Sequence, residues 1–249
     1  MMKLTPPIRD FKWKYISQLF GVNKAVYEPR FGIPGHNGID IVPPNPYGQK
    51  VVAAHDGTVT QLNKDDPTRK NGNGLWIQGW AGDEYVQTAY WHLSSFNVIP
   101  GQQVKAGDCV GFIGNTGFVF PAPSDACPQC GSHLHFAVSR LKIFPGNNTE
   151  FIPTDYKTFC DPTQGIFTVG DKLPIKFNRN LYYGCSGDDV SWLQTILKIE
   201  GLAKDYEPIG YFGGKTMRDV VLFQKKHNIT PSFGFVGPIT RSKLSIYCL

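Results

Sequence analysis

The sequence predicts two domains, a mainly antiparallel β domain followed by a small three-helix bundle. A chain of 249 residues allows one large or two modest domains, and 41% hydrophobic residues are enough to build their cores. Through the first two thirds, strand-like runs alternate with turns that use many of the 27 Gly and 19 Pro, as in β structure. After Tyr183 the apolar residues recur at helical spacing instead. We expect a lead-in at 1–20, the β domain at 21–143, a Pro-, Asn- and Asp-rich linker at 144–180, and the helical domain at 181–249.

Two short patterns nearly a hundred residues apart hold the residue types of a metal site. His36 and Asp40 form an H-x-x-x-D pair, and His133 and His135 form an H-x-H pair. In a strand, residues two or four positions apart point to one face, so each pair is expected to present its side chains together. Two neutral imidazoles and one carboxylate are the ligands that a catalytic Zn²⁺ takes when its fourth position stays open for water. The sequence therefore predicts a zinc site with one histidine left for acid–base chemistry.

These residues resemble the lysostaphin/LytM-type zinc endopeptidases, which cut peptide cross-links in bacterial cell walls. The likeness extends from about Phe20 to Leu141, and three further stretches carry it. They are a V-x-A-x-x-D-G-x-V hairpin at 52–59, a Y-x-H-L-S strand at 90–94, and a G-x-x-V-x-x-G hairpin with a glycine-rich turn at 101–117. The resemblance implies that His36, Asp40 and His135 bind zinc, that His133 is the general base, and that His92 is the second catalytic histidine.

One stretch departs from the family. The segment between the glycine-rich turn and H-x-H is usually short, whereas 118–132 inserts a loop here. We expect this loop at the rim of the cleft, where it would alter substrate preference. The bond that is cut therefore stays open among glycine bridges, direct D-alanyl links to diaminopimelate, and stem-peptide bonds.

Three amphipathic helices are expected in the last third. Ser186 predicts an N-cap before an acidic first turn, a second helix is expected at 215–227, and Pro238 suits the first turn of a third. The expected core residues are Val190, Leu193, Ile196 and Leu197 in the first helix, Val220, Val221 and Phe223 in the second, and Ile239, Leu244 and Ile246 in the third.

The same segment, 181–249, resembles the type 1 peptidoglycan-binding domain. The elements V-x-x-L-Q-x-x-L, G-x-F-G-x-x-T, V-x-x-F-Q and G-x-V-G-P-x-T are matched at 189–197, 210–216, 220–224 and 234–240. Most matched positions are core or turn residues, so the resemblance implies the fold more strongly than the ligand residues. It implies bacterial peptidoglycan as the partner of the chain, which we expect to be a monomer.

Charge and hydropathy exclude some partners. The net charge of +5 suits an anionic polymer, yet no Lys/Arg run carries the interleaved aromatics of nucleic-acid binders, so no nucleic acid is expected. The nearest cluster, 225–227, is expected to be a solvated helix face. No run of eighteen apolar residues is present, so no membrane span is expected. The opening residues 1–10 lack the apolar core of a signal peptide. We therefore expect a protein that acts at the cell wall and is released by a phage or exported by another route, with an antimicrobial phage endolysin favoured.

The six cysteines leave several pairings open. Cys185 and Cys248 flank the helical segment and could tie its ends together, whereas Cys127 and Cys130 could close a tight loop or remain thiols. Cys109 is expected to be a buried apolar residue, and the placement of Cys160 is not predicted.

Three polar residues outside the metal pattern are expected to be structural. His55 is expected in a surface turn, and His227 is expected to be exposed near a helix C-terminus. Asp56 is expected to shape a hairpin turn.

Two alternatives come from other classes of protein. A non-catalytic wall-binding or regulatory protein of the same fold is disfavoured because no member of the catalytic set is missing. A carrier module with a modifiable Lys105 is suggested by the hairpin at 101–107, which is also similar to lipoyl and biotinyl hairpins. It is disfavoured because the endopeptidases share this turn.

Overall fold

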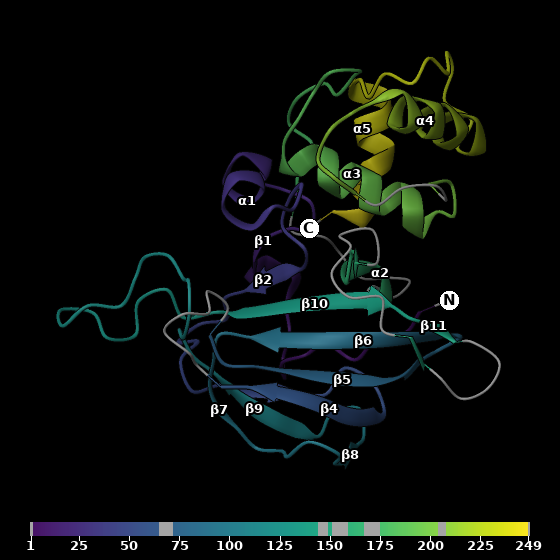
Figure 1. The fold of residues 1–249 in the computed structure, drawn as a ribbon. Coiled ribbons are helices and arrows are strands. Elements are labelled where there is room, and N and C mark those ends of the chain that lie inside the picture. Colours follow the sequence, from purple (N-terminus) through teal and green to yellow (C-terminus); the bar gives the residue numbers. More distant parts are fainter. Residues whose placement is uncertain are drawn as a thin grey trace. The chain divides into compact units, whose positions relative to one another are not determined.

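The computed structural model describes residues 2–64, 72–143, 149–150, 159–166, 175–203 and 208–248. Its contacts divide the chain into two compact units (Figure 1). The first unit contains Met1–Gln18 and Asn37–Ile166, and the second contains Leu19–His36 and Phe167–Leu249. Most of the expected linker lies outside the described residues, and the bounds of the four expected segments remain predictions.

The first unit is an antiparallel β structure. Its strands are β1 (Ile16–Gln18), β2 (Ile39–Ile41), β3 (Lys50–Val52), β4 (Gly57–Asn63), β5 (Gly74–Ala81), β6 (Glu84–Trp91), β7 (Leu93–Phe96), β8 (Gln103–Val104), β9 (Cys109–Ile113), β10 (Leu134–Arg140), β11 (Lys142–Ile143), β12 (Thr149–Glu150) and β13 (Phe159–Cys160). The short helices η1 (Trp13–Tyr15) and α2 (Thr163–Ile166) complete it.

Two main sheets organise these strands, and β11 and β12 pair separately. The larger follows the order β1-β2-β10-β6-β5-β4-β8, with β13 also paired to β10, and the smaller follows β3-β9-β7. Every pairing in both sheets is antiparallel, which confirms the predicted fold class of this domain. The long hairpin β5–β6 turns at Gly82, whose φ of +67° is a backbone conformation that glycine adopts readily.

The large sheet has one face in the core and one face that carries polar residues. On β10, Leu134, Phe136 and Val138 are fully buried, and the alternate residues include His135 and Ser139. Side chains alternate along a strand, so the H-x-H spacing places its histidines opposite the core face.

A buried polar chain crosses this core. The Tyr90 hydroxyl accepts a hydrogen bond from the Ala54 N–H at 2.8 Å and lies 3.2 Å from the Thr88 hydroxyl, which lies 3.1 Å from Nε2 of His55. Burial raises the pKa of Tyr90 to about 12 and lowers the pKa of His55. The expectation of a surface position for His55 is wrong, since only 3% of the residue is exposed.

The second unit is helical. It contains α1 (Lys24–Phe31), α3 (Asp188–Ile199), α4 (Gly214–Lys226), α5 (Pro238–Leu244) and η3 (Ser245–Tyr247). The helices α3, α4 and α5 confirm the predicted three-helix domain. The four expected core residues of α3 are all fully buried, as are Val220, Phe223 and Leu244.

Four details of the helical expectation need correction. The N-cap of α3 is Gly187 rather than Ser186. Ile239 and Ile246 are exposed rather than in the core, and Val221 is only half-buried. Ile239 is the second residue of α5, and the buried positions of that short helix are Thr240 and Leu244, one turn apart.

His227 is half-buried rather than exposed. Its ring lies 4.3 Å from that of Phe223, between centroids, and its Nε2 lies 3.3 Å from Oε1 of Glu200. The position just after α4 is as expected, but packing against these two residues covers most of the side chain.

The cysteines also differ from expectation. Cys127 and Cys130 form a disulfide, whereas no disulfide joins Cys185 to Cys248 at the ends of the helical segment. Cys185 lies on an extended segment bonded to Phe212, and Cys248 follows η3. Cys109 is half-exposed rather than buried, and Cys160 is buried in β13. Among the described residues no helix is both long and apolar enough to cross a membrane.

Candidate metal centre and active site

The register of the large sheet brings two of the predicted ligands side by side. Asp40 on β2 is the direct partner of His135 on β10, and His135 is in turn the partner of Trp91 on β6. Directly opposed residues in an antiparallel pair share one face of the sheet. Oδ1 of Asp40 and Nδ1 of His135 consequently lie 3.0 Å apart.

His36 reaches the same place from outside the strand. It precedes β2, so the expectation that His36 and Asp40 share one strand is wrong. Its backbone N–H donates to the Val22 carbonyl, and its own carbonyl accepts from the Gly21 N–H. Nδ1 of His36 lies 3.0 Å from the Leu19 carbonyl oxygen and donates to it. That contact selects the neutral tautomer in which Nε2 can act as a ligand.

The three side chains form a group that could hold a metal ion. One ligand atom from each of His36, Asp40 and His135 lies within 4.8 Å of the others, and all three residues are buried. Two imidazoles with one carboxylate are a donor set that suits a catalytic transition metal, so the residues present fit such an ion. Gly38 is needed for this approach, because a Cβ there would lie 2.4 Å from the Phe136 carbonyl oxygen and 3.0 Å from Nε2 of His135.

Two more imidazoles stand beside this group. Nε2 of His133 lies 3.6 Å from Oδ1 of Asp40, and its ring centroid is 4.5 Å from that of His92. Nδ1 of His133 donates to the Gly131 carbonyl at 2.8 Å, and Nδ1 of His92 donates to the Thr116 carbonyl at 2.8 Å. Because Nδ1 donates in each ring, Nε2 is the nitrogen that can accept a proton.

The environment keeps His92 neutral. Burial of its ring is the main cause that lowers the pKa of His92 to about 3, and the neighbouring His133 and His135 lower it further. His92 also adopts a left-handed backbone conformation, with φ of +64°. A non-glycine residue in that conformation is uncommon and typical of functional sites, where the surrounding structure holds it.

The groups that orient these histidines were not identified from the sequence. Thr116 accepts from His92 through its carbonyl, and its hydroxyl lies 3.0 Å from the Leu93 carbonyl oxygen and 2.8 Å from the Asn73 backbone nitrogen. Gly131 plays the corresponding part for His133. Any residue type can supply a backbone carbonyl, so these two partners could not be recognised from the sequence. Thr116 does lie in the glycine-rich turn noted in the sequence analysis.

The inserted loop at 118–132 is tied to the same turn. The Asn115 side-chain amide donates to the carbonyls of Pro128 and Cys130, at 2.9 and 3.0 Å. The Cys127–Cys130 disulfide closes the loop next to Gly131, the partner of His133. The loop is therefore connected to the candidate site through its own backbone.

Asp56 and Lys105 form an ion pair outside this site. Asp56 accepts from the Lys105 ammonium and from the Ala106 N–H, both at 2.9 Å. The hydrogen bond from Ala106 is the first cause that lowers the pKa of Asp56. Asp56 thus fastens one hairpin to another, in keeping with its predicted structural role.

Fold and site together describe a β protein in which two imidazoles and a carboxylate could hold a metal ion and two further histidines lie beside them. Comparison with known families identifies the domains. Residues 34–149 match Peptidase family M23, and residues 186–244 match the family described as "Putative peptidoglycan binding domain". The β region of the chain is thus similar to M23 peptidases, and the helical region is similar to peptidoglycan-binding domains.

Curated relatives align with the peptidase region. An "Uncharacterized metalloprotease" of Haemophilus influenzae is 32% identical over 132 residues, which are 50% of this chain and 24% of that protein. The "Peptidoglycan DD-endopeptidase ShyA" of Vibrio cholerae is 34% identical over 127 residues, 51% of this chain and 25% of its own. The chain thus matches about a quarter of the length of these relatives. Among solved structures, LytU is 27% identical with a TM-score of 0.42, covering 64% of this chain and 88% of its own.

Proposed function

We propose that this chain is a zinc-dependent endopeptidase that hydrolyses peptide cross-links of bacterial peptidoglycan, held on the wall by its helical domain. The observation that carries the proposal is the convergence of His36, Asp40 and His135 beside two further histidines. The match to Peptidase family M23 and the names of the DD-endopeptidase relatives support the reaction and the substrate class.

In this proposal His36, Asp40 and His135 hold the metal. Zinc, when bound, supplies a Lewis acid that polarises the scissile carbonyl and makes water acidic enough to lose a proton near neutral pH. The buried positions of the ligands and the sheet register between Asp40 and His135 support a site whose geometry exists before substrate arrives.

His133 is proposed as the general base. Its Nδ1–H is engaged by the Gly131 carbonyl, so its Nε2 can take the proton of an attacking water. A positioned base of this kind contributes roughly 10²- to 10⁴-fold in rate. The return of that proton to the leaving amine would complete hydrolysis.

His92 is proposed as the second catalytic histidine. Two roles follow from its position, a contact to the developing oxyanion or a contact to the attacking water. Its Nδ1–H is engaged by the Thr116 carbonyl, so the neutral ring offers an acceptor at Nε2. An acceptor suits the water and does not suit the oxyanion, which needs a donor. We therefore favour orientation of the water.

The helical domain is proposed to raise the local concentration of cross-links around the peptidase domain. The wall is an insoluble substrate, so attachment of one domain turns later encounters of the other into intramolecular events. Release by a phage as an endolysin remains our proposal for the origin of the chain.

Metal analysis with wall digestion tests this function. Asp40→Ala should lose zinc and activity together, whereas His133→Ala should keep zinc and lose hydrolysis of purified peptidoglycan. His227→Ala is the matched control, since it removes an imidazole that faces Glu200 in the helical unit, and it should change neither. A His133→Ala protein with full activity would refute the assignment of the base. A wild-type chain that binds walls but holds no zinc and cuts no cross-link would instead be a binding or regulatory protein.

A further inference from the structure

The helical unit contains the same loop twice, 24 positions apart. The segments 210–216 and 234–240 read G-Y-F-G-G-K-T and G-F-V-G-P-I-T. Each begins at a glycine with positive φ, +69° at Gly210 and +76° at Gly234, and each leads into the first turn of a helix, α4 or α5.

Each loop is held by hydrogen bonds to a glutamine of its own, and the two glutamines bond in the same way. The Gln194 side-chain amide donates to the Tyr211 carbonyl and to the Thr216 hydroxyl, both at 2.9 Å, and its carbonyl oxygen accepts from the Gly210 N–H. Gln224 repeats this pattern in the second loop, with donation to the Phe235 carbonyl and the Thr240 hydroxyl and acceptance from the Gly234 N–H. Both glutamines are almost fully buried, so each loop conformation is specified by an interior group.

This repetition places two aromatic rings in equivalent exposed positions. Tyr211 and Phe235 each follow the first glycine of their loop and are 43% and 42% exposed, whereas the next residues, Phe212 and Val236, are fully buried. Each ring lies against a glycine two residues later. A Cβ at Gly213 would be 3.4 Å from the Tyr211 ring, and one at Gly237 would be 2.8 Å from the Phe235 ring. Because Gly213 and Gly237 have no side chain, each ring can lie at the start of its helix.

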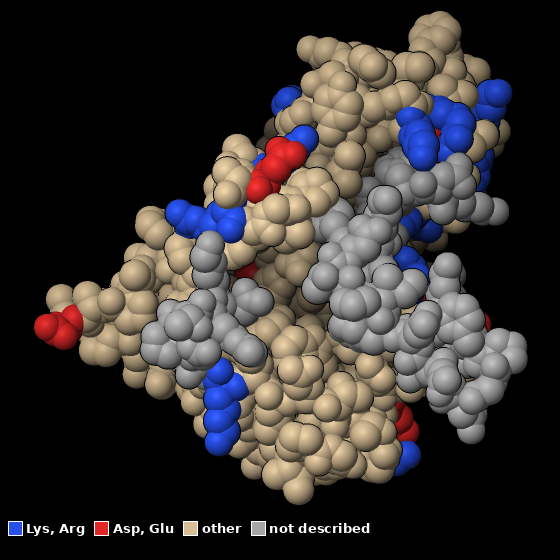
Figure 2. Space-filling view, in the orientation of Figure 1, with Lys and Arg blue, Asp and Glu red and all other residues tan. Residues whose placement is uncertain are grey.

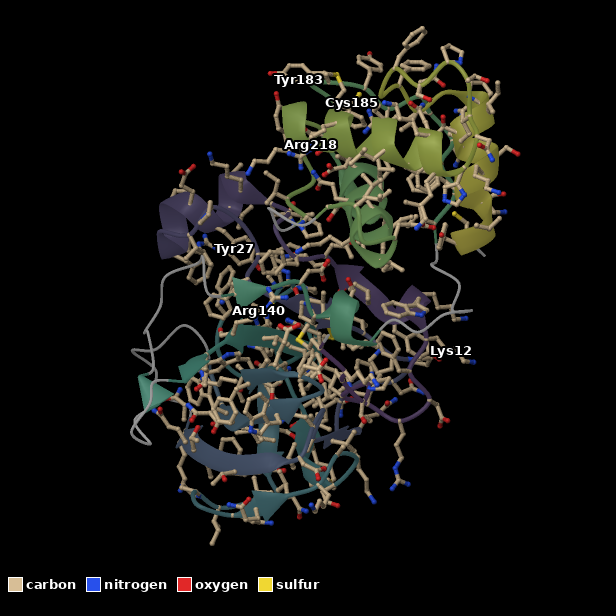
Figure 3. All side chains as sticks on the ribbon, turned by 90° about the vertical axis from the view of Figure 1, so that its right-hand side faces the viewer. Lys12, Tyr27, Arg140, Tyr183, Cys185 and Arg218 are labelled. Atoms are coloured by element: carbon tan, nitrogen blue, oxygen red, sulfur yellow. A yellow bond between two sulfur atoms is a disulfide. The ribbon has the colours of Figure 1, made fainter. Side chains whose placement is uncertain are left out.

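One segment pairs with both loops. Leu181 pairs with Val236 at one end of this segment, and Ser186 pairs with Tyr211 at the other. Between these pairings the segment turns, where the Cys185 N–H donates to the Tyr182 carbonyl at 3.0 Å and Gly184 has φ of +94°, so the two rings belong to one surface rather than to distant parts of the unit. Tyr182, on the same segment, stacks on Phe235 with centroids 6.1 Å apart and ring planes at 20°. Tyr183, labelled in Figure 3, is exposed on this segment as well.

Charged residues of both signs lie near the first ring in sequence. Lys215 is exposed four positions after Tyr211, and Asp188 is exposed two positions after Ser186, the partner of Tyr211. Neither α4 nor α5 has an acidic residue in its first turn. Lys and Arg side chains lie at the surface of the helical unit (Figure 2). A ligand of this surface is therefore expected to present apolar faces to the rings, with Lys215 available to an acidic group.

We propose that Tyr211, Phe235 and Tyr182 form a binding surface for the glycan strand of peptidoglycan. This inference rests on the proposed function and assigns residues to its wall-binding step. The C–H faces of pyranose rings stack on the electron-rich faces of aromatic side chains. Two equivalent rings fit a polymer whose sugar unit repeats, and the exposed Lys215 near the first ring offers a partner for a carboxylate of an attached stem peptide. Three residues make up the surface, and two of them lie within the segment that matches the peptidoglycan-binding family.

The test measures binding of the full chain to two polymers, intact peptidoglycan and glycan strands freed of stem peptides by an amidase. All proteins carry His133→Ala so that the wall stays intact during the measurement. Loss of one ring, in Tyr211→Ala or Phe235→Ala, should weaken binding roughly 2- to 10-fold, and loss of both should weaken it roughly tenfold or more on both polymers. Tyr211→Leu with Phe235→Leu keeps apolar bulk without a flat ring and should bind as weakly, which separates stacking from a folding defect.

Leu222→Ala is the matched control. Leu222 is 41% exposed on α4, close to the exposure of the two rings, but lies about 140° around the helix from Met217, which contacts the Gly234 loop. This variant should bind like its parent. Unchanged binding by the double variants would overturn the proposal. So would a parent protein that binds intact walls but not peptide-free strands, because the occupant would then be a stem peptide.

The failure of this proposal differs from failure of the endopeptidase assignment. Hydrolysis of a small soluble cross-linked peptide is measured with the same ring variants in a chain that retains His133. These variants should cleave it at the wild-type rate, because the rings hold only the polymer. If the wild type cuts no peptide but binds glycan through its rings, the endopeptidase is wrong and the glycan surface stands.

Discussion

Gly38→Ala should damage the proposed metal centre without replacing any of its ligands. The new Cβ would lie 2.4 Å from the Phe136 carbonyl oxygen and 3.0 Å from Nε2 of His135, whereas ordinary contacts begin at 3.4 Å. About 1 Å of backbone movement between β2 and β10 is therefore required, at the point where Asp40 faces His135. Changes next to metal ligands typically cost about 10- to 100-fold in metal affinity or activity, and we expect a loss of that size in zinc affinity.

The assay is a competition between the protein and a chromophoric zinc chelator, with hydrolysis of peptidoglycan measured at saturating zinc. Gly214→Ala is the matched control, because a Cβ at that position of α4 meets nothing within 4 Å. It should leave zinc affinity unchanged and leave stability unchanged or slightly raised, since alanine favours helix more than glycine does. If Gly38→Ala bound zinc as tightly as the wild type, the close approach of β2 to β10 would not be what positions Asp40 and His135.

Three further outcomes are expected. Tyr90→Phe removes the acceptor of the buried Ala54 N–H and should lower the free energy of unfolding by about 1–3 kcal/mol in denaturant titrations. The control Tyr85→Phe changes a half-buried ring and should lower that free energy by under about 0.5 kcal/mol. Equal effects of the two variants would refute the buried network. Burial lowers the pKa of His55 in the folded state below 6.5, so the unfolded chain binds more protons below pH 6.5. The His55 contribution should be fully present above about pH 6.5 and lost as the pH falls through the folded pKa, and wild type and His55→Gln should differ in slope only in that window. Zinc at about 1,000 times its dissociation constant should stabilise the peptidase domain by about 4 kcal/mol, and a chelator that leaves the melting temperature unchanged would contradict a folded-state metal site.

Local sequence patterns predicted the direction of side chains in strands and the buried faces of helices. The alternation of polar and apolar residues at 132–136 indicates that His133 and His135 point away from the core, because side-chain direction in a strand depends only on neighbouring residues. The helical spacing of Val190, Leu193, Ile196 and Leu197 likewise predicted the buried face of α3, which is fully buried. The class of fold follows from such periodicities.

The wrong predictions concern residues whose surroundings come from segments far apart in the sequence. His55 precedes an Asp-Gly turn, which locally indicates the surface, yet Thr88 and Tyr90 from β6 form a buried polar partner for it. Cys185 and Cys248 flank the helical segment, yet no disulfide joins them. Neither outcome can be read from nearby residues.

The sequence by itself determined the residue types of the metal site and the two periodicities, since both depend on spacing along the chain. Only the tertiary structure decided that His36 approaches from outside β2, and that the Leu19, Thr116 and Gly131 carbonyls set which imidazole nitrogens carry protons. It also decided that Gln194 and Gln224 hold the two loops on which the rings of Tyr211 and Phe235 are exposed. The physical reason is that hydrogen-bond partners far apart in sequence become neighbours only when strands and helices pack.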